Sequence, residues 1–99
     1  MTRGDHPGGK FARMWEAKVL PGRLHECQGM LADAVVPAAL RAGALRAEVF
    51  RAEADGEPGR VVLITWWENR AAAEAFRESV GEAPGDVVAR AHAWVFEAV

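Results

Sequence analysis

Few side chains in this 99-residue sequence could carry out chemistry on their own. His92 lies in the last apolar stretch, and a histidine could serve there as a general base because its imidazole titrates near neutrality. Arg13 lies near the start of the first apolar stretch, where its guanidinium could hold a carboxylate or a phenolate. Each residue also has a structural alternative. His92 could form an ion-pair and hydrogen-bond cluster with Glu16 and Arg90, and Arg13 could extend along the protein surface.

The other nucleophilic and metal-binding side chains form no recognisable motif. His25, Glu26 and Cys27 are consecutive on an expected helix and therefore point in different directions, which does not suit a metal site. A single cysteine excludes an intrachain disulfide, and its helical setting favours buried packing over a reactive thiol. Ser79 lacks the Gly-x-Ser-x-Gly context, and the glycines form no phosphate-binding loop. We therefore expect no metal and no cofactor.

The tryptophans mark the element around which the chain is organised. Residues 61–67 are seven uncharged, β-rich residues ending in Trp66 and Trp67, as expected for an inner strand covered on both faces. Asn69 can then cap a helix. Apolar residues then recur at helical spacing, at Ala72, Ala73, Phe76 and Val80. Gly81 and Pro84 follow and predict the end of this helix. Its charged residues, Glu74, Arg77 and Glu78, are expected to face solvent.

The remaining periodic segments complete one domain. Residues 23–38 are expected to form a helix. Strands are expected at residues 11–20, 45–53 and 86–99, and a turn is expected at residues 55–59. Pro37 is expected to break or kink the first helix. Residues 1–10 read as a flexible tail and 11–99 as the domain. The order βαββαβ predicts an α+β, ferredoxin-like fold, in which a four-stranded antiparallel sheet carries both helices on one face.

Alternation along the strands separates two faces of the sheet. One face is small and apolar and suits close cover by helices: Ala17, Val19, Ala47, Val49, Leu63, Ala89, Ala91 and Ala93. Trp15 and Trp67 belong to the same face. They could form the walls of an aromatic pocket under the helices, or pack with Leu24, Leu31 and Phe76 as an ordinary core.

The other face mixes charged residues with large apolar ones, which are Met14, Phe50, Ile64, Trp66, Trp94 and Phe96. A monomer would expose more contiguous apolar area than soluble proteins usually do. We therefore expect a homodimer that covers Phe50, Trp66, Trp94 and Phe96.

Charge and hydropathy limit the other partners. The formal net charge is −2 and the basic residues are not clustered, so we expect no nucleic acid partner. No apolar run approaches the ~20 residues of a membrane span, and residues 1–10 lack the apolar core of a signal peptide. These observations predict a cytoplasmic protein that does not bind membranes.

Three stretches of the sequence resemble the antibiotic biosynthesis monooxygenase (ABM) family. They are Leu20-Pro21-Gly22-Arg23 after the first strand, the turn from Asp55 to Arg60, and Trp67-Glu68-Asn69 before the helix at 71–76. The resemblance implies a dimeric α+β barrel made of two ferredoxin-like sheets. It also implies a cofactor-independent monooxygenase acting on a small aromatic or polyketide-like substrate held between sheet and helices.

The resemblance transfers only in part to individual residues. Trp67 matches the strand-end tryptophan that lines the substrate cleft in quinone-forming members, which implies a substrate-binding site of Trp67, Trp15, Leu63 and Phe76. Those members place an asparagine where this sequence has Leu63 and a tyrosine where it has Ala73. Haem-degrading members have a tryptophan at Phe76, an asparagine at about Trp15 and a histidine on the second helix, so we expect no haem degradation. The alternative is a non-catalytic dimeric protein that binds a small ligand or another protein.

Overall fold

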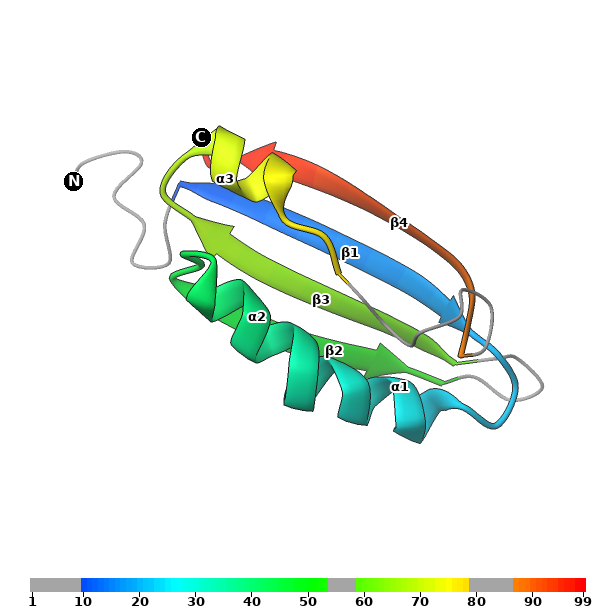
Figure 1. Ribbon diagram of the computed structural model, residues 1–99. Helices are drawn as coiled ribbons and strands as arrows, with labels where there is room; N and C mark the ends of the chain where they lie inside the picture. The colour runs from blue at the N-terminus through cyan, green and yellow to red at the C-terminus, as the bar shows by residue number, and fades with distance from the viewer. Residues whose placement is uncertain (1–9, 54–58, 79–86) are drawn as a thin grey trace.

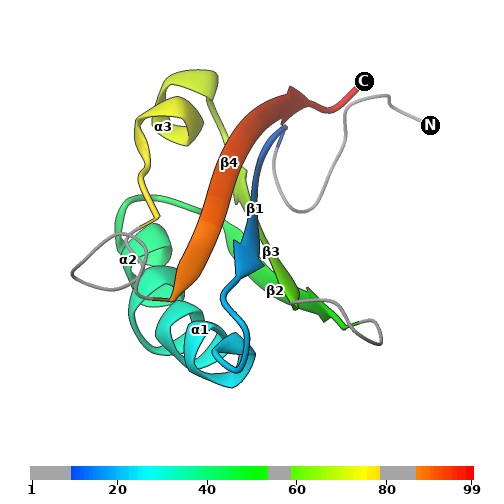
Figure 2. The ribbon, with the colours of Figure 1, turned by 90° about the vertical axis from the view of Figure 1, so that its right-hand side faces the viewer.

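The computed structural model describes residues 10–53, 59–78 and 87–99. Within these ranges the elements follow in the order β1 (Phe11–Val19), α1 (Leu24–Met30), the π-helical segment η1 (Leu31–Val35), α2 (Val36–Arg41), β2 (Arg46–Ala52), β3 (Arg60–Trp67), α3 (Arg70–Ala75) and β4 (Val88–Glu97). The strands form one antiparallel sheet in the order β2-β3-β1-β4 (Figure 1). All the helices lie on the same face of that sheet (Figure 2). The predicted α+β, ferredoxin-like arrangement is confirmed.

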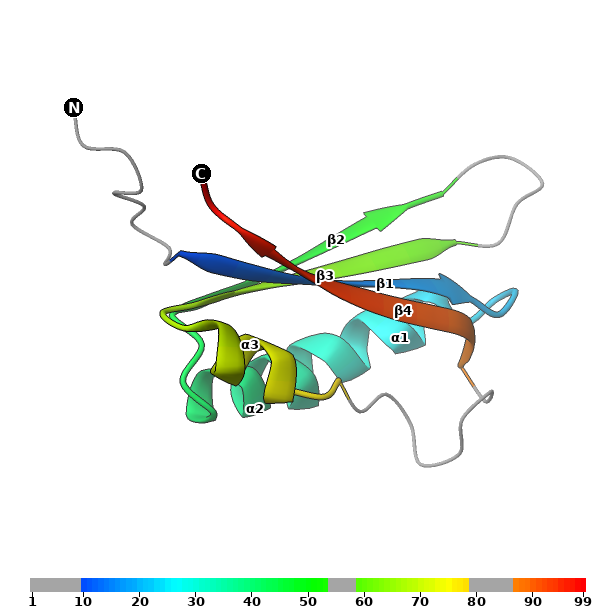
Figure 3. The ribbon, with the colours of Figure 1, turned by 90° about the horizontal axis from the view of Figure 1, so that it is seen from above.

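The register of the strands separates the two faces as the alternation predicted. On β1, Arg13 is opposite Thr65 of β3, and Trp15 is opposite Leu63. These four residues are buried. The view along the sheet edge shows the helices on one side of the sheet only, so the buried face is the one that the helices cover (Figure 3). The core between the sheet and the helices is made of buried apolar side chains, including Trp15, Val19, Cys27, Leu31, Val35, Val61, Leu63, Trp67, Ala73 and Phe76.

Pro37 does not break the first helix. The chain continues through α1, η1 and α2 to Arg41, and a π turn directly precedes the proline. Val36 donates its backbone N–H to the carbonyl of Leu31, five residues earlier. In a regular helix the proline ring would meet the carbonyl four residues before it, and the wider π turn changes that spacing. The expected break is replaced by a local change of helical winding.

The second predicted helix is confirmed at its start and is shorter than expected. The Asn69 Oδ1 accepts the backbone N–H of Ala72 at 2.8 Å, which is the expected N-cap. Helix α3 ends at Ala75, because Phe76 has extended backbone angles (φ −68°, ψ 142°). The predicted continuation through residues 76–78 is therefore wrong, and Val80, Gly81 and Pro84 lie outside the described residues.

Two further predictions fall partly or wholly outside the described residues. Residues 1–9 of the expected tail are not described, and neither are residues 54–58 of the expected turn between β2 and β3. The turn after β1 is described, and Gly22 has a φ of +78°, which favours glycine.

Among the described residues, no helix has the length and apolar character needed to span a membrane.

Candidate functional site

An aromatic layer lies between the sheet and α3. The ring centroids of Trp67, at the end of β3, and Phe76, just after α3, are 5.5 Å apart with a tilt of 42° between the rings. Trp67 is 1% exposed, and Trp15 and Leu63 are buried on the same face of the sheet. The antiparallel register brings Trp15, Leu63 and Trp67 to the helix-covered side of the sheet, and α3 places Phe76 against them. We call these four residues the aromatic layer.

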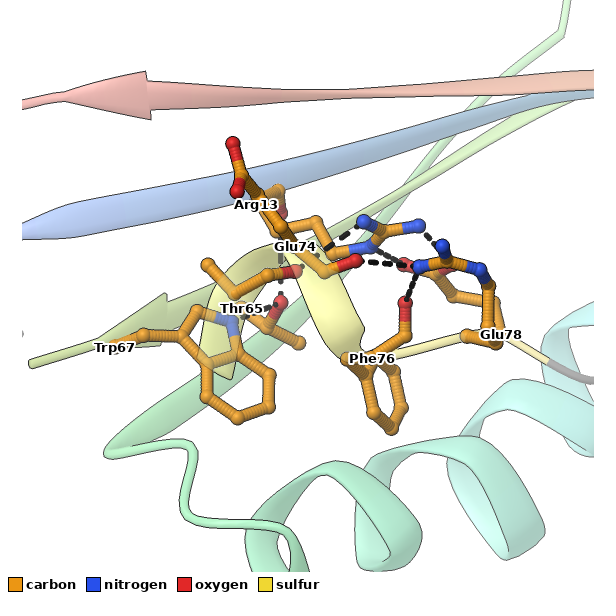
Figure 4. Close-up of polar contacts among 8 residues, drawn as sticks. Arg13, Thr65, Trp67, Glu74, Phe76 and Glu78 are labelled. Atoms are coloured by element: carbon orange, nitrogen blue, oxygen red, sulfur yellow. Dashed lines mark hydrogen bonds and ion pairs between the residues drawn. The ribbon is translucent and has the colours of Figure 1, made fainter. Parts of the chain in front are cut away.

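Thr65 fixes the orientation of the Trp67 indole. The indole N–H of Trp67 donates to the Thr65 Oγ1 at 2.8 Å (Figure 4). The Thr65 hydroxyl lies 3.5 Å from the backbone carbonyl of Arg13 on the neighbouring strand, and Thr65 is fully buried. A buried indole N–H needs such an acceptor, since leaving it unpaired would cost free energy. Sequence reasoning placed Thr65 in a buried strand but assigned it no role.

Arg13 is buried among these groups, so its predicted surface alternative is wrong. Its side chain is 10% exposed, and the Nε and Nη2 atoms donate to Oε2 and Oε1 of Glu78 at 2.7 and 3.0 Å. The Nη1 atom donates to the backbone carbonyl of Ala73 in α3 at 3.2 Å (Figure 4). This bidentate geometry is the strong, charge-assisted form of the arginine–carboxylate contact. It ties strand β1 to the chain that leaves α3.

The Arg13 guanidinium keeps hydrogen-bonding capacity beyond these contacts. An arginine carries five N–H donors, and the contacts with the described residues use three of them. The two remaining donors are one N–H on each terminal nitrogen. A ligand oxygen that reached the guanidinium could therefore be bound without first breaking the contact with Glu78.

Glu78 is a site residue that the sequence reasoning missed. It was expected on the solvent face of a helix reaching Val80, yet its side chain is only 2% exposed. The difference follows from the early end of α3: after Ala75 the chain is extended, and helical spacing no longer says where a side chain points. The available signal was charge, because an arginine on the covered face of a sheet needs a carboxylate nearby.

His92 lies on the opposite, open face of the sheet. Its Nε2 is 3.1 Å from the Glu16 Oε1, and its ring packs edge-on against Trp94 at a centroid distance of 4.3 Å. Glu16 and His92 line a hollow of about 150 Å³. Three basic side chains complete its lining, and they are Lys18, Arg60 and Arg90. The sheet therefore separates His92 from Arg13, and the two candidate polar groups belong to different sites.

The small residues of β4 leave part of the helix-facing side open. Ala91 is exposed and Ala93 is half-buried, although both face the helix layer. A second hollow, of about 330 Å³, lies at the β2 edge and is lined by Gln28, Ala32, Val49, Phe50 and Arg51. Neither hollow is lined by the aromatic layer, whose four residues are buried.

The described part of the chain offers no cluster suited to a metal ion. Residues 10–53, 59–78 and 87–99 contain no group of three or more His, Cys, Asp or Glu side chains arranged to hold one. Cys27 is fully buried, as expected. Burial, and to a lesser degree the neighbouring Glu26 carboxylate, raises the pKa of the Cys27 thiol above its ordinary value. The thiol is thus kept in its protonated, weakly nucleophilic form.

Comparisons with known proteins agree with this architecture. The family model for antibiotic biosynthesis monooxygenases matches residues 11–94. A crystal structure of a "putative antibiotic biosynthesis monooxygenase" from Bacillus cereus superimposes with a TM-score of 0.64 at 16% sequence identity, covering 91% of this chain and 92% of that one. At this identity the likeness concerns the fold. No curated protein sequence matches the chain at a significant level.

Proposed function

Because this chain belongs to the antibiotic biosynthesis monooxygenase family, we propose that it binds a small aromatic or polyketide-like molecule between the sheet and the helices and oxygenates it without a metal or a flavin. The observation that carries the proposal is the position of Arg13. A buried guanidinium, two of whose N–H donors are not used by residues 10–53, 59–78 and 87–99, lies on the same side of the sheet as Trp67 and Phe76. Such a site combines a stacking surface with a holder for an oxyanion.

The proposed reaction uses the reducing power of the substrate itself. A phenolic substrate with an acidic CH2 group loses a proton, and the resulting carbanion, delocalised onto an oxygen, reduces O2. One oxygen atom becomes the new carbonyl, and the other leaves as water with the two hydrogens of the CH2 group. Arg13 stabilises the anion, since a charge-assisted hydrogen bond gains strength where water is excluded. Trp67 and Trp15 hold the rings of the substrate.

The proposed unit is a homodimer joined through the open face of the sheet. Phe50, Trp94 and Phe96 on that face are 49–51% exposed in the single chain. Covering them would remove a large apolar patch from water, which is the usual driving force for such association. Light scattering after gel filtration at micromolar concentration should give twice the chain mass. A monomer mass would contradict the dimer without touching the proposed chemistry.

A non-catalytic ligand-binding role is the second candidate. The observation that favours it is the apolar character of Leu63 in β3 and Ala73 in α3, both of which are fully buried. The quinone-forming members that the chain resembles have an asparagine and a tyrosine at these two places, and such a polar pair would help to hold the developing anion. In this role the chain binds the same kind of molecule, and Arg13 only orients it.

One titration separates these possibilities. Hydroxylated anthrones and naphthols are added to the wild type, Trp67→Phe and the control Trp94→Phe, while tryptophan fluorescence and oxygen uptake are recorded together. Trp67→Phe should bind about tenfold more weakly, because stacking on an indole contributes roughly 0.5–1.5 kcal/mol beyond burial. Trp94→Phe, on the opposite face, should bind as the wild type does. Saturable binding with oxygen uptake supports the oxygenase, binding without uptake supports the second role, and no binding refutes both.

A further inference from the structure

Three basic residues form one row across the open face of the sheet. Lys18 of β1 is directly opposite Arg60 of β3 on one side and Arg90 of β4 on the other. Directly opposed side chains on neighbouring antiparallel strands have Cβ atoms about 4.5–5.5 Å apart, and like charges at such positions destabilise the sheet. We call these three residues the basic row. Repulsion among these three cations destabilises the sheet when no anion is bound beside them.

The carboxylates of the same face are engaged elsewhere. Glu16 lies 3.1 Å from His92, and Glu48 lies 3.5 Å from Arg46 and accepts the indole N–H of Trp66. Among the described residues, no carboxylate lies within ion-pair distance of the basic row. Of the described carboxylates, Glu16 lines the same hollow but contacts His92, so the three cations of the basic row exceed the one carboxylate beside them.

The charge of the open face opposes that of the whole molecule. The strand residues on this face include four cations, Lys18, Arg46, Arg60 and Arg90, against two carboxylates, Glu16 and Glu48, which gives a net charge of +2. The complete chain has a formal net charge of −2. The positive charge is thus concentrated on one face, and at the basic row it borders the hollow of about 150 Å³.

We propose that the basic row is a binding site for a phosphate group. Phosphate carries a charge of about −1.5 to −2 at neutral pH, which is close in size to the net charge of +2 on the open face. Its oxygens accept hydrogen bonds from the forked N–H groups of arginine. Arg60 and Arg90 supply such forks from β3 and β4, the strands on either side of β1, and Lys18 supplies an ammonium group between them. His92 and Glu16 form the boundary toward the apolar end of the face.

The site lies on the face opposite the aromatic layer, so it does not depend on the proposed oxygenase reaction. It does bear on the proposed dimer. Two copies joined through this face would bring two surfaces of net charge +2 together, and one phosphate per chain would neutralise both. Phosphate should then favour the dimer over the monomer, because a ligand shifts an equilibrium toward the state it binds better.

Thermal unfolding with inorganic phosphate as the probe tests the site. The wild type is titrated with sodium phosphate at pH 7.5, while sodium chloride keeps the ionic strength constant, and isothermal titration calorimetry gives the stoichiometry. We expect a saturable rise in Tm with one phosphate per chain. In Lys18→Gln and Arg90→Gln, half-saturation should need at least tenfold more phosphate. Without phosphate, both variants should unfold at the same temperature as the wild type or higher, because repulsion within the row is relieved.

Arg46→Gln is the matched control on the same face. Arg46 already has Glu48 as a partner, and its guanidinium lies 4.9 Å from the Trp66 ring centre, so its removal should leave the phosphate response unchanged. Equal Tm shifts in phosphate and in chloride would overturn the proposal. So would variants of the basic row that unfold at lower temperature without phosphate, since this result would mean that a carboxylate of the chain or of a second copy already neutralises the row.

Discussion

Glu78→Ala is the most informative substitution, because it removes the carboxylate that neutralises a buried arginine. The Arg13 and Glu78 side chains are 10% and 2% exposed, so the remaining guanidinium would stay largely out of water. Deleting one partner of a buried ion pair costs about 3–5 kcal/mol. Domains of this size have a total stability of about 5–15 kcal/mol, so the variant should lose a large part of its free energy of unfolding.

Two comparisons establish that burial is the cause. Arg70 and Glu97 form an ion pair of similar length, 3.1 Å, whose side chains are 50% and 43% exposed. Glu97→Gln should therefore cost less than about 1 kcal/mol. Replacing both members of the buried pair, Arg13→Met with Glu78→Leu, should be nearly neutral, because no unpaired charge remains. The free energies are measured by urea unfolding at one fixed protein concentration, followed by tryptophan fluorescence.

Aromatic carboxylates test whether the vacated position is also a ligand site. Benzoate added to Glu78→Ala can replace the missing carboxylate next to Arg13 and place its ring in the aromatic layer. At a concentration of 100 times its Kd, it should restore about 2.7 kcal/mol. Acetate should restore less, and neutral benzamide should have no effect. The reasoning is refuted if Glu78→Ala costs no more than Glu97→Gln, or if benzoate and benzamide stabilise it equally.

Two further predictions concern the cap and the cysteine. Asn69→Ala should lower the free energy of unfolding by about 1 kcal/mol, because the Ala72 N–H loses its acceptor, whereas Asn69→Asp should cost less; urea unfolding measures both. The raised pKa of Cys27 means that the folded state keeps its thiol proton to higher pH than the unfolded chain does. Stability should therefore fall above roughly pH 8.5, where exposed thiols ionise, and Cys27→Ser should remove this component of the decline.

The face of the sheet to which each strand residue belongs could be predicted from the sequence, because it depends on local alternation of side chains. Side chains alternate along a strand, and the antiparallel register then carries that alternation across the sheet. Trp15, Leu63 and Trp67 therefore had to share the covered side, and their burial confirms it. The cap at Asn69 was equally predictable, since it depends on residues three positions apart.

The pair of Arg13 and Glu78 could not be predicted from spacing, because it joins residues 65 positions apart through tertiary contacts. Ala71 to Ala75 favour a helix, and no local signal ends it before Phe76. In the structure the Phe76 ring packs against Trp67 and the Glu78 carboxylate reaches Arg13, and these contacts decide where the helix ends. The π turn before Pro37 likewise preserves a helix that the proline alone would have broken.

The strand order also determines when the chain can fold. Strand β1 comes first in the sequence and pairs only with strands from the second half, as Phe11 pairs with Trp67 and with Glu97. During synthesis, β1 therefore has no partner until β3 has been made, and its second edge stays unpaired until β4 has been made. Contacts this distant in sequence slow folding relative to a helical bundle of the same size. Until then the backbone edges of β1 are unpaired, and unpaired strand edges favour association between incomplete chains.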